Sequence, residues 1–107
     1  MHGIQGTKIG SDELVNLLNK WQRTSSKLQL TISLPEVTTI LTIVLHKVEF
    51  PTITVTLVGR DEWSDRIDIH LSGCVLERCE GNDGIKTVVR ATWLSWKGRE
   101  ILFAETA

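Results

Sequence analysis

Little in this sequence marks a specific biochemical activity. Only two of the 107 residues are cysteines, and 12 basic and 13 acidic residues leave a formal net charge of −1. A chain without excess positive charge has no electrostatic preference for nucleic acid or an anionic membrane, so we expect neither as a partner. We also find no motif typical of catalysis, nucleotide binding or a metal site. These absences favour a non-catalytic binding or self-assembly module that needs no cofactor.

Long apolar runs and targeting signals are also missing. The apolar run 43–45 ends at His46, and a membrane-spanning helix needs roughly 18 such residues. Residues 1–10 lack the charged start, apolar centre and small-residue cleavage site of a secretory signal. We therefore expect a cytoplasmic protein with no membrane partner.

The chain length is typical of one domain. Three glycines among the first ten residues predict a flexible N-terminal arm over 1–10, followed by a single domain over 11–107. The domain should begin with an amphipathic helix, which Ser11 can cap and which Thr24 ends. Its apolar stripe has helical spacing, and we expect Leu17 and Trp21 to be buried against the sheet.

From residue 27 onward, most of the sequence has the pattern of β-strands. Apolar and polar residues alternate over 27–34 and 52–58, which is typical of strands with one buried face. Further strands are predicted from residue 66, over 85–96 and over 99–105, with turns at 82–84 and 97–98. The predicted fold is α+β and mainly β: an N-terminal helix followed by a six-stranded antiparallel meander that forms a small barrel-like sheet.

Segment 35–50 fits two structures. Ser33 and Glu36 match a helix capping box, and Pro35 suits a first helical turn. However, seven of the eight residues from 37 to 44 are β-branched, and such side chains are unfavourable in helices. We therefore expect a strand, covered on both faces at 43–45, with a helix as the alternative.

Residues 11–105 resemble the Sm-like small β-barrels in the order of their elements. Sm proteins carry a glycine and an Asp-x-x-x-Asn pattern around their second and third strands, and an Arg-Gly pair near the fourth. The corresponding stretches here read LHKVEFPTITVTLVG and RIDIHLSG, and they contain neither motif. The resemblance implies a small barrel fold, and an RNA-binding Sm-like protein is an alternative function.

The cysteines offer a second alternative. Cys74 and Cys79 are five residues apart, so one continuous strand sends them to opposite faces, and we expect two reduced thiols rather than a disulfide. His70 and Cys74 are four apart and would share a face of that strand. They could centre a small metal- or thiol-dependent enzyme, although no further ligand has the spacing of a zinc site.

A candidate interaction surface lies in loop 60–66. Trp63 is surrounded there by charged side chains, including Arg60 and Arg66, and tryptophan and arginine are typical anchors of protein interfaces. Alternatively, Trp63 folds back over the end of the sheet with its indole N–H hydrogen-bonded.

Trp96 and Phe103 are further candidates for an interaction surface. Trp93 and Trp96 are three apart, so a regular strand sends them to opposite faces. Residues 101–103 are consecutive apolar side chains that must face both sides of the last strand. One side can be the core, whereas the other needs a cover.

Strand edges favour self-association. The first or last strand of an open meander has unpaired backbone groups, and residues 28–34 contain no proline, inward charge or bulge to protect them. We therefore expect a homo-oligomer, most simply a dimer, although an unknown protein partner is possible.

Overall fold

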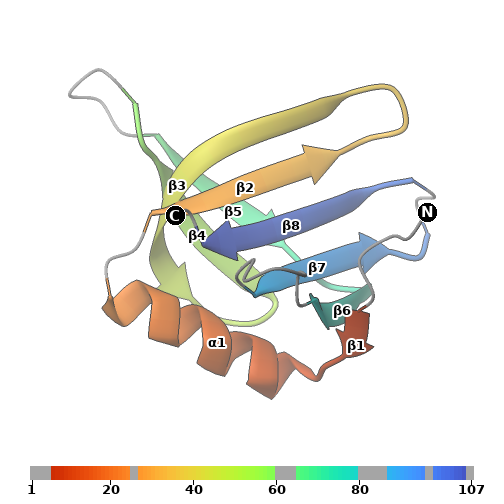
Figure 1. Ribbon diagram of the computed structural model, residues 1–107, viewed down its shortest axis with the longest axis horizontal. Coiled ribbons are helices and arrows are strands. Elements are labelled where there is room, and N and C mark those ends of the chain that lie inside the picture. Colours follow the sequence, from red (N-terminus) through yellow and green to blue (C-terminus); the bar gives the residue numbers. More distant parts are fainter. Residues whose placement is uncertain (1–5, 25–26, 60–64, 80–86, 96–97, 106–107) are drawn as a thin grey trace.

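The computed structural model describes residues 6–24, 27–59, 65–79, 87–95 and 98–105. The fold is α+β and mainly β, as predicted, with one helix at the N-terminal side of an antiparallel sheet (Figure 1). The sheet has eight strands, however, and not six. The elements are β1 (Gly6–Lys8), α1 (Ser11–Arg23), β2 (Leu28–Ser33), β3 (Thr38–Val48), β4 (Thr52–Leu57), β5 (Arg66–His70), β6 (Cys74–Cys79), β7 (Val88–Trp93) and β8 (Glu100–Glu105).

The strand order is β1-β6-β7-β8-β2-β3-β4-β5. The sheet is curved but not closed, so the predicted barrel is corrected to an open sheet whose outer strands are β1 and β5. The first and last predicted strands, β2 and β8, pair with each other along their full length, from Leu28 opposite Glu105 to Ser33 opposite Glu100. Residues 28–34 are therefore not an open edge, and this reason for expecting a dimer was wrong.

Two features raise the strand count. Gly6–Lys8, which we expected in a flexible arm, forms β1 and pairs with Cys79–Glu77 of β6; residues 1–5 lie outside the described part. The strand predicted from residue 66 also ends at His70. Gly73, with φ of +76°, lies in the turn that separates β5 from β6, and this conformation is easy only for glycine.

The ambiguous segment 35–50 is a strand, as preferred, and the helical alternative is wrong. Ile43 and Leu45 are buried, whereas Val44 between them is partly exposed, so the second face is not fully covered as expected. The register with β4 shifts between Leu45 and Lys47. This bulge turns Val48, rather than Lys47, toward the core, because an extra residue reverses the alternation of the strand.

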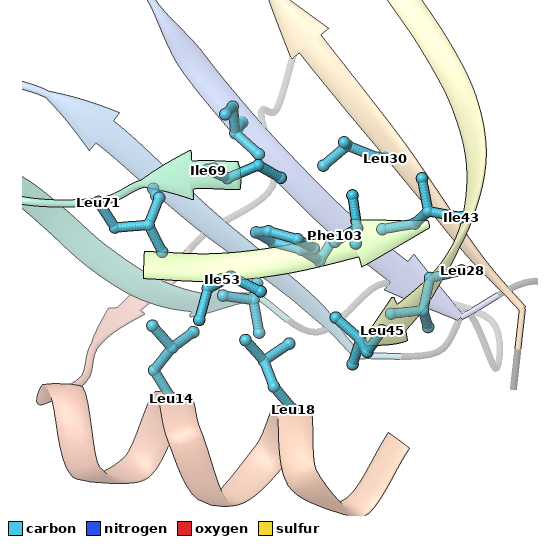
Figure 2. Packing of buried hydrophobic residues seen from close by; sticks show 14 of the residues in the cluster. Leu14, Leu18, Leu28, Leu30, Ile43, Leu45, Ile53, Ile69, Leu71 and Phe103 are labelled. Atoms are coloured by element: carbon cyan, nitrogen blue, oxygen red, sulfur yellow. The ribbon is translucent and has the colours of Figure 1, made fainter. Parts of the chain in front are cut away.

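Helix α1 lies along one side of the curved sheet (Figure 1). Its side chains Leu14 and Leu18 point into the core beside Leu45 and Ile53 (Figure 2), and all four are buried. Leu17, predicted to be buried, is only partly so, although it packs against the same cluster. Trp21, at 2% exposure, is buried as predicted.

Polar side-chain contacts hold α1 at its C-terminal end. The predicted cap was wrong by one residue: Gly10 is the N-cap, and no side chain caps the N-terminal end. At the other end, Thr24 is the C-cap, and its hydroxyl donates to the carbonyl of Trp21 at 2.9 Å. Gln22 Nε2 donates to the carbonyl of His46 at 2.7 Å. The bulge in β3 thus supplies an acceptor that fixes the helix on the sheet.

Candidate functional site

The predicted interaction residues do not form one surface. Arg66 is exposed at the start of β5. Phe103 is fully buried in the core, so its place in an interaction surface is corrected: odd residues of β8 face inward, and Leu102 faces the other side. Arg60, Trp63 and Trp96 lie outside the described residues, and their roles stay predictions.

The proposed pairing of His70 with Cys74 loses its structural basis. It assumed one continuous strand, but His70 ends β5 and Cys74 begins β6 after a turn. His70 is exposed, with its Nδ1 hydrogen-bonded to the Thr52 hydroxyl at 2.9 Å. Cys74 instead packs against the hydrophobic core. In the described ranges, no three His, Cys, Asp or Glu residues are placed to hold a metal ion.

Both thiols are free, as predicted. Burial raises the pKa of Cys74. Burial also raises the pKa of Cys79, with a smaller opposing effect from the positive charge of Arg90. A raised pKa lowers the thiolate fraction at neutral pH, and the thiolate is the reactive form. The environment of both cysteines therefore suits packing rather than nucleophilic chemistry.

Arg90 connects three strands on the outer face of the sheet. Its Nη2 lies 3.0 Å from Glu77 Oε1, and its Nε donates to the same oxygen at 3.1 Å. Glu100 Oε2 lies 3.9 Å from Nε on the other side. Burial opposes the charged form and is the largest single effect, but the hydrogen bond that Arg90 donates to Glu77 and the nearby negative charges together outweigh it and raise the pKa of Arg90. The guanidinium therefore has a structural role, because it links β7 to a carboxylate of β6 and to one of β8.

The most unusual surface is formed by the hairpin that joins β2 and β3. The backbones of Leu34 and Val37 close the hairpin through reciprocal hydrogen bonds of 2.8 and 3.4 Å, with Pro35 and Glu36 between them. Leu34 is 41% exposed, Val37 is 53% exposed and Ile40 is 59% exposed. These three large apolar side chains are therefore exposed to solvent. The hairpin that carries them is at the end of the sheet away from α1 (Figure 1).

The turn between β7 and β8 lies beside this hairpin. Gly98 lies close to the ring of Pro35, which a Cβ atom added at this position would meet. Trp93 N donates to the carbonyl of Arg99 at 3.3 Å, which continues the β7–β8 register into the turn. Leu94, which follows Trp93 in this turn, is 71% exposed. We call these exposed apolar residues at the hairpin end, Leu34, Val37, Ile40 and Leu94, the hairpin surface; strand alternation puts Leu34 and Val37 on the core face and Ile40 on the opposite face.

The sequence analysis did not identify the hairpin surface. Leu34 completes the apolar alternation of 27–34 and was placed on a covered face, whereas the strand predicted over 35–50 gave no face to Val37 or Ile40. The available signal was Pro35 between apolar residues, with Glu36 the only charged residue from 28 to 45. Such a hairpin carries apolar side chains to its tip, where the sheet no longer covers them.

Comparisons with known families, curated proteins and solved structures find no match to this chain. Within the described part, the helix is too short and too polar to cross a membrane. The candidate site therefore depends on the geometry of the chain itself.

Proposed function

We propose that this protein is a non-catalytic binding module that contacts a protein partner through the hairpin surface. One observation carries the proposal. Six large apolar side chains are exposed in the described part of the chain, and four of them lie at the hairpin end of the sheet, with Leu34 and Val37 on one face and Ile40 on the other. Apolar side chains scattered singly over a surface are ordinary, but a group of them exposed at one end of a sheet is typical of binding sites.

The chemistry of the hairpin surface restricts its partner. Glu36 is the only charged residue between positions 28 and 45, and threonines occupy 38 and 39. The β2–β3 hairpin itself has one negative charge and branched apolar side chains, and Arg99 is exposed in the adjacent turn; a phosphate backbone is bound by clusters of lysine and arginine. The hairpin surface suits the apolar face of a helix or strand, since depletion of charge is typical of the centre of protein interfaces.

The two alternative functions have less support. RNA binding would use exposed basic and aromatic residues on one face, whereas Arg90 is bound by Glu77 and Glu100. Thiol chemistry would need a stabilised thiolate, whereas burial raises the pKa of Cys74. We therefore retain binding as the proposal.

The proposal can be tested with an environment-sensitive dye. Anilinonaphthalene sulfonate fluoresces when it binds exposed apolar surface, so it should bind the wild-type protein. The double variant V37K/I40K should bind less dye, because it places two charges in the hairpin surface. F50K is the matched control: Phe50 is 40% exposed but lies beyond the opposite end of β3. An equal effect of F50K and V37K/I40K, or no dye binding by the wild type, would contradict the proposal.

Selection of peptide ligands gives a second, independent measurement. Peptides selected from a random displayed library on the wild-type protein should bind F50K and lose binding to V37K/I40K. Circular dichroism of each variant shows whether the sheet is intact. If the selected peptides bind V37K/I40K as well as the wild type, the binding surface lies elsewhere.

A further inference from the structure

Strand β5 is an open edge of the sheet. It pairs with β4, and no strand in the described ranges pairs with its other side. Leu57 N donates to the carbonyl of Asp65 at 2.9 Å, and Leu71 N donates to the carbonyl of Pro51 at 2.8 Å. In an antiparallel ladder the bonded residues alternate, so Ile67 and Ile69 face β4. The N–H and C=O groups of Arg66, Asp68 and His70 therefore point to the open edge.

The two outer strands differ in how well they are protected. β1 has three residues and includes Lys8, and short edge strands with lysine resist pairing with another chain. β5 has five residues without a proline, a glycine or a register shift. Its side chains offer charges of both signs, Arg66 and Asp68, two positions apart on the exposed face. This edge can accept a strand if the charges of that strand are complementary.

We propose that two copies of the chain pair antiparallel through β5, with Arg66 of each copy opposite Asp68 of the other. This register joins the edge backbone groups of residues 66 and 68 in hydrogen-bonded pairs. It also forms two symmetric pairs of opposite charge, and opposite charges directly across strands stabilise a sheet. A two-fold dimer uses the same surface on both copies, so that surface must be complementary to itself. The charges of β5 meet this requirement in the proposed register.

The other registers that join these backbone groups are less favourable. One places Arg66 opposite Arg66 of the second copy, and another places Asp68 opposite Asp68. A third pairs Asp68 with His70, and it centres on Ile69, which is already buried. Threonines of β4 bond both side chains alike, Thr52 with His70 and Thr54 with Asp68, so these bonds do not separate the registers. The proposed register centres on Ile67, which is only partly buried and would be covered by its own copy.

The dimer goes beyond the binding function proposed above and does not depend on it. The hairpin surface belongs to β2, β3 and the β7–β8 turn, whereas the dimer uses β5 at the edge of the sheet. V37K/I40K should therefore keep the dimer, and R66D should keep dye binding at the hairpin. The two proposals are therefore tested independently: if one is contradicted, the experiment on the other remains valid.

Sedimentation velocity and light scattering at tens of micromolar test the dimer. The wild type should have twice the 12.0 kDa chain mass. R66D places an aspartate opposite Asp68 of the second copy, and D68R places an arginine opposite Arg66. Each variant alone should dissociate about tenfold more readily or worse, because two attractive pairs become repulsive.

An equimolar mixture of R66D and D68R tests whether charge pairing across β5 holds the dimer. One strand then has two negative charges and the other has two positive charges at the facing positions, so the mixture should form a heterodimer. The double variant R66D/D68R should also regain the dimer, which excludes misfolding as the cause of its loss. A monomeric wild type, a dimeric R66D, a mixture that stays monomeric, or loss of the dimer in V37K/I40K would each overturn the proposal.

Discussion

Gly98 packs against the ring of Pro35, so that the turn after β7 holds the tip of the β2–β3 hairpin. A Cβ atom added to Gly98 would lie 3.2 Å from Pro35 Cγ. Gly98 also has a φ of +78°, in the left-handed region that other residues avoid. Both the close approach and the backbone conformation favour glycine at this position.

We predict that G98A is more destabilising than G73A. Gly73 has nearly the same φ, +76°, but nothing lies within 4 Å of an added Cβ. G73A therefore measures the cost of the left-handed conformation alone, about 1–2 kcal/mol. G98A adds the contact with Pro35, and its urea-unfolding midpoint should be lower than that of G73A.

A double variant isolates the contact. P35A removes the ring that an alanine at position 98 would meet, so G98A should cost less in the P35A background than in the wild type. Equal costs in both backgrounds would mean that Gly98 is required only for its backbone conformation.

The second prediction concerns the helix. Leu18 is fully buried, whereas Leu17 is partly exposed. L18A should lower the free energy of unfolding by about 2–5 kcal/mol, as expected for large-to-small changes in a core. L17A should cost clearly less, because part of this side chain is already in water. Chemical denaturation of both variants makes the comparison, and equal losses would contradict the observed orientation of α1.

Local patterns predicted the strands that are buried on one face. Leu28 and Leu30 in β2, and Ile53 and Val55 in β4, alternate with polar residues and are all buried. Two features depended on distant parts of the chain instead. β1 has no apolar alternation and forms by pairing with β6, and the pairing of β2 with β8 joins the two ends of the domain. Neither pairing leaves a periodic signal in the sequence. The sequence analysis therefore expected an open edge at β2 or β8, whereas the outer strands are β1 and β5.

The candidate site was less predictable than the fold for a related reason. An apolar residue in an alternating pattern is normally placed in the core, as Phe103 is. Ile40 is also apolar but lies three residues before Ile43, so it faces the opposite side of β3 and is exposed. The sequence does not show which part of β3 is buried by other elements, since that depends on the packing of α1 and the other strands.

The third prediction concerns Arg90. R90M removes the guanidinium between Glu77 and Glu100, which leaves two partly buried carboxylates without their shared cation. We expect a loss of about 1–2 kcal/mol in the free energy of unfolding, between the values for exposed and buried pairs. K47M is the matched control, because Lys47 and Glu49 form an ion pair at 3.5 Å with both side chains mostly exposed, and it should change stability by less than about 0.5 kcal/mol.

A double-mutant comparison separates charge from packing. If the ion pair is responsible, R90M should cost less in the E77Q background than in the wild type. An unchanged cost would show that the hydrocarbon part of Arg90 stabilises the sheet and that its charge does not.

The fourth prediction is that the pH dependence of stability reports the buried thiols. Burial raises the pKa of both cysteines from the ordinary value of 9.0. Below that value the thiols are protonated in the folded and unfolded chains, so their contribution to stability is fully present. As the pH rises above it, the unfolded chain loses these protons first, and stability falls until the folded thiols also ionise. The urea midpoint should therefore drop on the alkaline side, and less so in C74S/C79S.

The last prediction is that β1 protects Cys79 from modification. Cys79 is 1% exposed, and an added Cβ on Gly6 would lie 3.0 Å from its Sγ and 2.9 Å from Glu77 Oε2. G6A should therefore push β1 away from β6 and speed the alkylation of Cys79 by iodoacetamide. Cys74 is an internal control in the same experiment, because it lies on the core side of β6, and its rate should stay unchanged. Peptide mass spectrometry over time measures both rates. If both rise together, G6A has loosened the whole sheet, and if neither rises, β1 is not what shields the thiol.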